Sequence, residues 1–187
     1  MIITITGKPC SGKGAAVAKI IEKHNFQKFS AGDIFRRIGA ERGLNVLEIN
    51  QAADVNDIDR LVDEEITAIG KRDLEKDIIF DSRTAWHFIP GSFKVFLDIE
   101  PKEAARRLIN SNRTTENINV TEEEAIADLE KRWNIENDRY LKLYNFDNRT
   151  LSNYNLVVDT TNLSVEDVAD QIMTAYFKFL EDKKSHQ

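Results

Sequence analysis

Short apolar runs alternate with longer segments of helical periodicity along this chain. Four runs rich in β-branched and aromatic residues predict buried strands over residues 2–5, 78–80, 93–97 and 154–158. A weaker run at residues 26–29 predicts a fifth strand. Because the runs are continuously apolar, we expect a sheet covered by helices on both faces, with parallel strands joined by helical crossovers.

Helix start signals follow the strand runs. A helix over residues 101–109 begins with a proline, which suits the first helical turn. Thr121 and Glu124 form a capping-box pattern before a long helix that runs to about Tyr144. Ser164 opens the last helix, whose predicted apolar stripe consists of Val165, Val168, Ile172, Met173, Tyr176 and Phe177.

Composition then narrows the class of protein. The 187 residues make about one domain, and 41% apolar residues can form a sizeable core. The net charge of −6 disfavours a nucleic-acid-binding protein. The single cysteine excludes an internal disulfide, no apolar run is long enough to cross a membrane, and the N-terminus lacks the basic region of a secretory signal. We therefore expect a cytoplasmic protein.

The most informative segment lies between the first predicted strand and a predicted helix over residues 15–22. Its sequence is Gly7-Lys8-Pro9-Cys10-Ser11-Gly12-Lys13-Gly14. Two glycines let the backbone curl so that its N–H groups point inward, and the following helix N-terminus adds partial positive charge. Lys13 would reach the β- and γ-phosphates of a nucleotide. The alternative is a tight strand–helix turn with an exposed lysine.

This loop departs from the general phosphate-loop motif, which has Ser or Thr after the lysine. Gly14 and Ala15 stand there instead. A glycine after the lysine resembles the nucleoside monophosphate kinases, whose loops read Gly-Lys-Gly-Thr. More closely, residues 1–179 resemble the short cytidylate kinase-like family, through the loop, the segment Ser30-Ala31-Gly32-Asp33-Ile34-Phe35-Arg36, the triplet Asp81-Ser82-Arg83 and an arginine-bearing helix at residues 132–140. Ala15 replaces the family's usual Thr, and Cys10 its usual Gly.

The resemblance implies a three-layer α/β/α fold of the P-loop NTPase type. It implies a five-stranded parallel sheet, a small helical insert that binds the nucleoside monophosphate, and a short lid. The whole chain, residues 1–187, would be one domain. Its parts would be a core (1–30, 76–110 and 150–187), the monophosphate-binding helices (31–75), and the lid with the arginine helix (111–149).

A second phosphate site is indicated just after the weak strand. Ser30 is a candidate helix cap, and Arg36 lies one turn into the helix. In the family, the matching arginine holds the acceptor phosphate, and the residue matching Ala31 lies against the acceptor base. The alternative is a capped helix with a surface arginine paired to Asp33.

Asp81 ends a buried strand at the carboxyl edge of the predicted sheet, where open α/β sheets bind ligands. Its carboxylate could hold magnesium through water, with Ser11 as a weaker candidate ligand. Arg83 could form bidentate bonds with an acceptor phosphate. The alternative is a buried ion pair between Asp81 and Arg83.

The long helix places Arg132, Glu136 and Arg139 on one face, at positions i, i+4 and i+7. The alternative is a surface salt-bridge ladder. In the family, this helix turns an arginine, an acid and an arginine toward the acceptor base and the phosphates. Arg106 and Arg113 flank a polar loop and would be the lid arginines that contact ATP, whereas we expect Arg107 to face solvent.

These residues predict phosphoryl transfer from ATP, with Mg²⁺, to a nucleoside monophosphate, CMP or dCMP. Lys13, Arg83, Arg132 and Arg139 would be catalytic. Two alternatives stay open: another small-molecule kinase of this fold, or a nucleotide-binding protein with little turnover, because Gly14 and Ala15 lack a hydroxyl. The expected partners are small nucleotides, with no nucleic acid and no membrane, and the expected state is a monomer.

Overall fold

A computed structural model describes residues 1–43, 55–72, 76–111 and 120–185. Five strands form one parallel sheet in the order β2-β3-β1-β4-β5. The strands are β1 (Ile2–Gly7), β2 (Gln27–Ser30), β3 (Ile78–Asp81), β4 (Phe93–Asp98) and β5 (Leu156–Asp159). All five predicted strands are present, including the weak second one.

The last strand begins two residues later than predicted. Asn155 donates its backbone N–H to the Lys94 carbonyl, and its side-chain oxygen accepts the Lys94 N–H, both at 2.8 Å. The ring of Tyr154 packs against Trp86, with the ring centroids 5.3 Å apart. Side-chain bonding and aromatic packing therefore replace regular strand geometry at this end.

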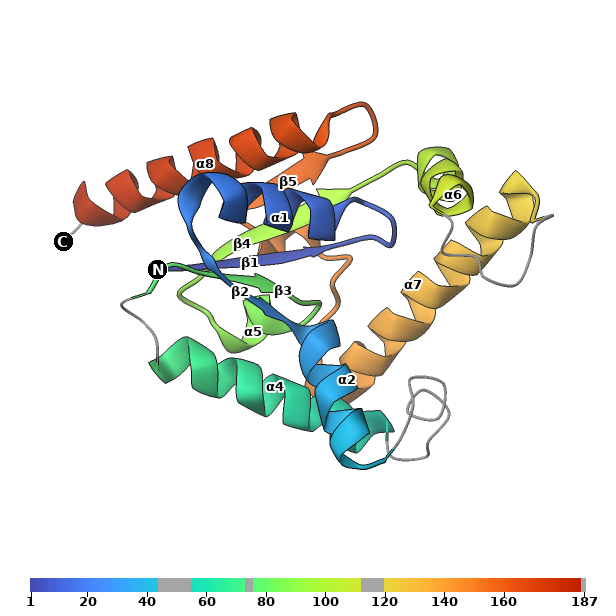
Figure 1. The fold of residues 1–187 in the computed structure, drawn as a ribbon, viewed down its shortest axis with the longest axis horizontal. Coiled ribbons are helices and arrows are strands. Elements are labelled where there is room, and N and C mark those ends of the chain that lie inside the picture. Colours follow the sequence, from blue (N-terminus) through green and yellow to red (C-terminus); the bar gives the residue numbers. More distant parts are fainter. Residues whose placement is uncertain (44–54, 73–75, 112–119, 186–187) are drawn as a thin grey trace.

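Seven α-helices lie in the described ranges (Figure 1). Helices α1 and α8 cover one face of the sheet, and α2, α4 and α5 cover the other. Helix α7 packs against α6 near its start and approaches α4 at its end. Their bounds are α1 (Lys13–His24), α2 (Ala31–Glu41), α4 (Val55–Arg72), α5 (Ala85–Phe88), α6 (Pro101–Asn110), α7 (Glu122–Tyr144) and α8 (Val165–Ser185), with a 3₁₀ turn at Leu151–Asn153.

Two apolar layers hold this arrangement. One lies between the sheet and α1 with α8, and includes Ile3, Val17 and Ile172. The other lies between the sheet and α2 with α4, and includes Ile66 and Phe80. This is the predicted three-layer α/β/α fold, and it directs the carboxyl ends of all five strands to one edge.

The helix start signals are confirmed in detail. The Thr121 hydroxyl accepts the N–H of Glu124, whose carboxylate accepts the N–H of Thr121 in return, which completes the capping box. The predicted stripe of α8 is correct for its middle but wrong at two positions. Val165 is 44% exposed and Phe177 is 47% exposed, because these side chains lie beyond the width of the sheet-facing stripe.

In the ranges that the structure describes, no helix has both the length and the apolar content needed to cross a membrane.

Candidate active site

The loop after β1 owes its shape to close backbone packing. A side chain at Gly7 would collide with β4, since a Cβ there would lie 2.8 Å from the Leu97 nitrogen. Lys8 donates its N–H to the Leu97 carbonyl at 3.0 Å. Gly12, with φ of 83°, forms the left-handed cap of α1, and Cys10 also has positive φ. The loop is therefore fixed by its backbone before any nucleotide binds.

Lys13 folds back over this loop, and its Nζ donates to the Gly7 carbonyl at 3.4 Å. Burial, together with the neighbouring Arg83, lowers the pKa of Lys13 to about 7, whereas Asp81 and Glu136 oppose the shift. The lysine is thus surrounded by both signs of charge. Nucleotide phosphates would supply the missing negative charge and favour the ammonium form.

The side chains of Asp81 and Ser11 fit the predicted magnesium site. The Ser11 hydroxyl is buried and has no hydrogen-bond partner in the described ranges. Asp81 ends β3 with a partly exposed carboxylate, and that side chain forms no ion pair with any residue that the structure describes. An uncommitted carboxylate and hydroxyl beside the phosphate loop are hard oxygen donors of the kind that magnesium prefers.

Arg83 lies between the phosphate loop and α7. Its Nε pairs with Glu136 at 2.7 Å, its guanidinium donates to the Gly7 carbonyl, and its Cζ lies 5.1 Å from the ring centroid of Trp133. The expected alternative, an ion pair with Asp81, does not form. Arg83 is therefore held at the loop by contacts with α7.

The predicted row on α7 divides into two parts. Glu136 bridges two arginines, because its second oxygen pairs with Arg132 at 3.1 Å. Arg132 is largely exposed, so this pair alone resembles the surface ladder. Arg139 turns toward α4 instead, and its Nε lies 3.1 Å from Asp59. Burial raises the pKa of Asp59, and the Arg139 charge opposes the shift.

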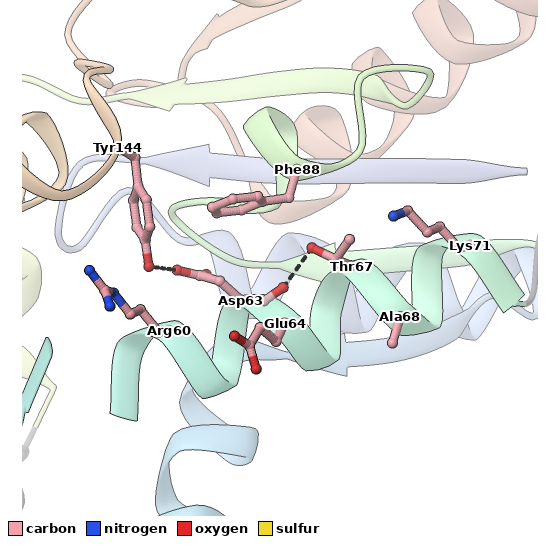
Figure 2. Close-up of a pocket in the computed structure, with 8 residues that line it drawn as sticks. All are labelled: Arg60, Asp63, Glu64, Thr67, Ala68, Lys71, Phe88 and Tyr144. Carbon is pink, nitrogen blue, oxygen red and sulfur yellow. Dashed lines mark hydrogen bonds between the residues drawn. The ribbon is translucent and has the colours of Figure 1, made fainter. Parts of the chain in front are cut away.

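A second contact fastens α4 to the rest of the site. The buried Asp63 carboxylate accepts the Thr84 hydroxyl at 2.5 Å. It also accepts the Tyr144 hydroxyl at 2.6 Å, and Figure 2 shows this second bond. Burial raises the pKa of Asp63 to about 6. A cavity of about 460 Å³ opens beside this contact, between α4 and Phe88. The Tyr144 bond links α4 to the end of α7, and the Thr84 bond links α4 to the turn between β3 and α5.

Ser30 and Arg36 show the local structure that the surface alternative describes. The Ser30 hydroxyl accepts the Asp33 N–H at 3.3 Å, as predicted for a helix cap. Arg36 pairs with Asp33, and its side chain is 57% exposed. Ala31 is partly buried at the start of α2. The structure does not bring Arg36 into contact with Arg83, so its acceptor role stays a prediction.

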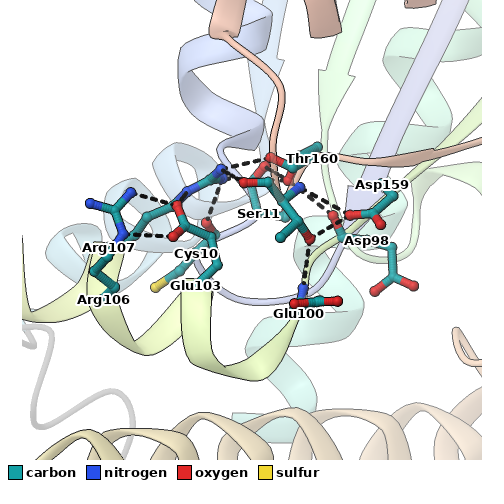
Figure 3. Close-up of polar contacts among 10 residues, drawn as sticks. Cys10, Ser11, Asp98, Glu100, Glu103, Arg106, Arg107, Asp159 and Thr160 are labelled. Atoms are coloured by element: carbon teal, nitrogen blue, oxygen red, sulfur yellow. Dashed lines mark hydrogen bonds and ion pairs between the residues drawn. The ribbon is translucent and has the colours of Figure 1, made fainter.

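On α6, two neighbouring arginines exchange the orientations expected of them, whereas the predicted role of Arg106 toward ATP stays a prediction. Arg107, expected in solvent, donates to the Thr160 carbonyl at 2.6 Å and to the Cys10 carbonyl at 3.5 Å (Figure 3). Arg106, expected at ATP, is 63% exposed, and its partner among the described residues is Glu103. Helix rotation explains the exchange, because α6 turns the side chain of Arg107 toward the strand ends. The other predicted lid residue, Arg113, lies outside the described residues.

The loop after β5 completes the donor side. The Thr160 hydroxyl donates to the Asp98 carbonyl at 2.9 Å and lies 3.1 Å from the Ser11 carbonyl. A cavity of about 580 Å³ lies here, lined by Gly12, Ala15, Arg107 and the residues that follow Thr160. Sequence reasoning did not identify Asp59 as the partner of Arg139, and it assigned Arg107 to solvent. The four-residue spacing of Glu103 and Arg107 predicts an ion pair on one face of α6, and that pair could have indicated that Arg107 is not free in solvent.

Comparisons with known proteins agree with this geometry. A family model described as an AAA domain matches residues 6–126. A cytidylate kinase from Sulfurisphaera tokodaii is 36% identical over 188 residues, which covers all of both chains. Another from Methanothrix thermoacetophila is 33% identical and covers 86% of this chain and 88% of the relative.

Solved structures support the same fold. A protein from Eubacterium ventriosum described as uncharacterized has a TM-score of 0.70 at 15% identity, covering 93% of this chain and 96% of its own. Shikimate kinase from Bacteroides thetaiotaomicron has a TM-score of 0.63 at 15% identity, covering 97% of this chain and 98% of its own. These likenesses show the three-layer fold.

Proposed function

Because the chain belongs to the cytidylate kinase-like family of P-loop kinases, we propose that it transfers a phosphoryl group from ATP to CMP or dCMP. The family makes the chain a phosphotransferase of the nucleoside monophosphate kinase type. One observation carries the proposal. Lys13 shares a cluster of charges with Arg83, Arg132 and Asp81 at the edge where the phosphate loop meets α7.

The donor would bind along the loop after β1. Backbone N–H groups and the N-terminus of α1 would surround the β- and γ-phosphates, and Lys13 would pair with them. The donor base would enter the cavity beside Thr160, with Arg107 behind the loop. This assignment keeps residues 7–15 as the ATP-binding segment and leaves Arg106 and Arg113 for the closed state.

The acceptor would bind on the other side of Lys13. Arg83 would bind its phosphate, and Arg36 would join it from α2. Residues 132–139 of α7 would extend from the reacting phosphates toward the nucleoside. Glu136 would keep Arg83 and Arg132 together, since it already pairs with both.

Magnesium, when bound, neutralises charge on the transferring phosphates. Asp81 would hold it through water, and the unpaired Ser11 hydroxyl could add a ligand. The protein's own contribution is positioning. Two phosphates must be held in line, and a well-placed arginine can contribute about 10³–10⁵ in rate. No general base is needed, because the acceptor phosphate is already ionised.

The parts of the fold would divide this work. The core would hold ATP, residues 31–75 would hold the monophosphate, and residues 111–149 would supply the lid and the arginine helix. Closure around both nucleotides would exclude water and limit ATP hydrolysis.

A coupled ADP-release assay tests the proposal. Wild-type protein is given ATP and magnesium with CMP, dCMP, UMP, AMP or GMP, one at a time. We expect the highest kcat/KM with CMP or dCMP, and only background ADP release when no acceptor is present. Lys13→Ala protein serves as the control for contaminating kinases. No acceptor-dependent ADP release with any of the five would reject the proposal.

A further inference from the structure

The amino edge of the sheet carries a cavity that the proposed phosphoryl transfer does not use. The cavity has a volume of about 450 Å³, a size typical of small-molecule sites, and it lies between the end of α4 and the last turns of α8. Ile2, the first residue of β1, is part of its wall. The phosphate loop follows the other end of β1, so the cavity and the loop lie at opposite edges of the sheet (Figure 1).

The length of α8 accounts for one wall of the cavity. The 21 residues of α8 rise about 31 Å, whereas the six residues of β1 span about 20 Å, so α8 runs past the amino edge of the sheet. After Tyr176, the sheet-facing stripe of α8 continues at positions i+3, i+4 and i+7, which are Phe179, Leu180 and Lys183. All four of these residues line the cavity.

The rim of the cavity is positively charged. Lys71, near the end of α4, and Lys183, near the end of α8, both line it, and none of its described lining residues is acidic. The chain as a whole has a net charge of −6, so this is a local reversal of charge. Lys183 Nζ donates to the Gly91 carbonyl at 3.2 Å and lies 4.6 Å from the Phe179 ring centroid, which holds the ammonium at the cavity. The two lysines favour a ligand with an anionic group.

A buried hydroxyl supplies the second polar feature. Tyr176 is 2% exposed, and its hydroxyl has no hydrogen-bond partner in the described ranges. Burial, together with the charge of Asp77, raises the pKa of Tyr176 to about 12, so the hydroxyl keeps its proton near neutral pH. Buried polar groups without partners are rare, and an acceptor on a ligand would satisfy this one. Because Asp77 already places negative charge nearby, that acceptor should be neutral.

We infer that this cavity binds an aromatic carboxylate that carries a neutral acceptor at its other end. Its carboxylate would pair with Lys71 and Lys183, and its neutral acceptor would accept the hydrogen bond of the Tyr176 hydroxyl. The rings of Phe88, Tyr176 and Phe179 line the cavity and would pack against the rings of the ligand. Figure 2 shows Phe88 and Lys71 on the same side of α4. The site would be separate from the nucleotides.

An alternative is an empty space between the two helix ends. Apolar cavities can stay empty, and in that case the lysines and the hydroxyl would contribute nothing to binding. The two interpretations therefore differ in what each polar group adds, and the experiment varies the ligand and the protein together.

Isothermal titration of the full chain uses two probes. In 6-methoxy-2-naphthoate, a carboxylate and an ether oxygen lie at opposite ends of the rings, and 2-naphthoate lacks the ether oxygen. We expect wild type to bind 6-methoxy-2-naphthoate at one site with a Kd below about 1 mM. Saturating ATP or CMP should leave that Kd unchanged, because the nucleotides would bind at the opposite edge of the sheet.

Two variants separate the polar groups. Tyr176→Phe keeps the ring and removes the unpaired hydroxyl, so its melting temperature should hold. It should bind 6-methoxy-2-naphthoate about three- to tenfold more weakly and 2-naphthoate as wild type does. Lys183→Gln should weaken both probes by about two- to fivefold. Lys184→Gln is the matched control, because Lys184 is exposed, points about 100° away from Lys183 around α8 and lies outside the described lining. It should leave both Kd values unchanged.

Three results would overturn the inference. The first is no saturable binding of 6-methoxy-2-naphthoate by wild type. The second is loss of that binding in the presence of ATP or CMP, which would place the probe at the nucleotide site. The third is an unchanged Kd for this probe in either Tyr176→Phe or Lys183→Gln. None of these measurements requires phosphoryl transfer, so the proposed function is tested separately.

Discussion

The proposed donor and acceptor sides of this site are built in different ways. On the donor side, backbone atoms set the geometry, through the packing of Gly7 against β4 and the bonds of Arg107 to two loop carbonyls. On the acceptor side, charged side chains set it, through the pairs of Arg83 with Glu136 and of Arg139 with Asp59. The loop after β1 is preorganised, whereas we expect a bound nucleotide to displace the partners that the acceptor-side groups hold now.

Because the two sides differ in this way, substitutions on each side should have different consequences. Removing a side chain from the donor loop leaves the backbone cradle in place. Removing one member of an acceptor-side pair leaves its partner with an unbalanced charge, so both binding and local structure change. Donor variants should therefore report on chemistry, and acceptor variants on chemistry and packing together.

Lys13→Ala should have the largest effect. The ammonium is the charge that pairs with the transferring phosphates, so we expect kcat to fall by about 10³-fold or more. Stability should hold or increase, because burial disfavours the charged lysine in the empty protein. ADP release and thermal melting measure the two effects. Near-wild-type turnover in the folded variant would contradict the donor-loop assignment.

Arg83→Ala and Arg36→Ala should have the next largest effects on activity. They compare a mostly buried arginine with an exposed one. We expect kcat/KM for CMP to fall by about a hundredfold for Arg83→Ala and about tenfold for Arg36→Ala. ATP affinity, measured by titration, should change less than acceptor use in both. Equal losses for the two ligands would indicate a structural role instead.

The Arg83 variant needs a control, because its loss leaves Glu136 beside Arg132 alone. Arg83→Lys keeps the charge but loses the bidentate geometry. If acceptor binding depends on that geometry, Arg83→Lys should keep the melting temperature and still show weakened use of CMP. Full activity in Arg83→Lys would reduce the role of Arg83 to charge alone.

The sequence predicted the strands and the loop after β1 better than the side-chain pairs around them. Strands and the loop were readable because continuous apolar runs and glycine spacing act locally. The partner of Arg83 was not readable, because Glu136 lies 53 residues further along the chain and reaches it only through the packing of α7. The choice between Arg106 and Arg107 depended on how α6 is rotated about its own axis. Neighbouring residues of a helix point about 100° apart, so one of the two arginines faces the loop and the other does not.

Arg107→Ala and Arg106→Ala form a matched pair on the donor side. Arg107 ties α6 to the Cys10 and Thr160 carbonyls, so its loss should loosen the loop and weaken ATP binding by about tenfold. Arg106 is exposed and pairs with Glu103, so its loss should change ATP affinity by less than about threefold. Nucleotide titration measures both. The opposite ranking would restore Arg106 as the donor-side arginine.

Ala15→Thr should have the smallest effect, and it should be a gain. Ala15 lines the cavity beside Thr160, and the resemblance implies a threonine at this position that would bond the donor phosphates. A hydrogen bond to a charged group contributes about 1.5–3 kcal/mol, but part of this is lost in fixing the new side chain, so we expect a gain of up to about tenfold. The exposed position of Ala15 leaves room for the added atoms.

Steady-state kinetics with CMP and saturating magnesium should show a higher kcat or a lower KM for ATP, with KM for CMP unchanged. Gly14→Ala, which adds bulk without a hydroxyl at the neighbouring position, should give no gain. A slower Ala15→Thr enzyme would mean that the loop already satisfies the phosphates without this bond.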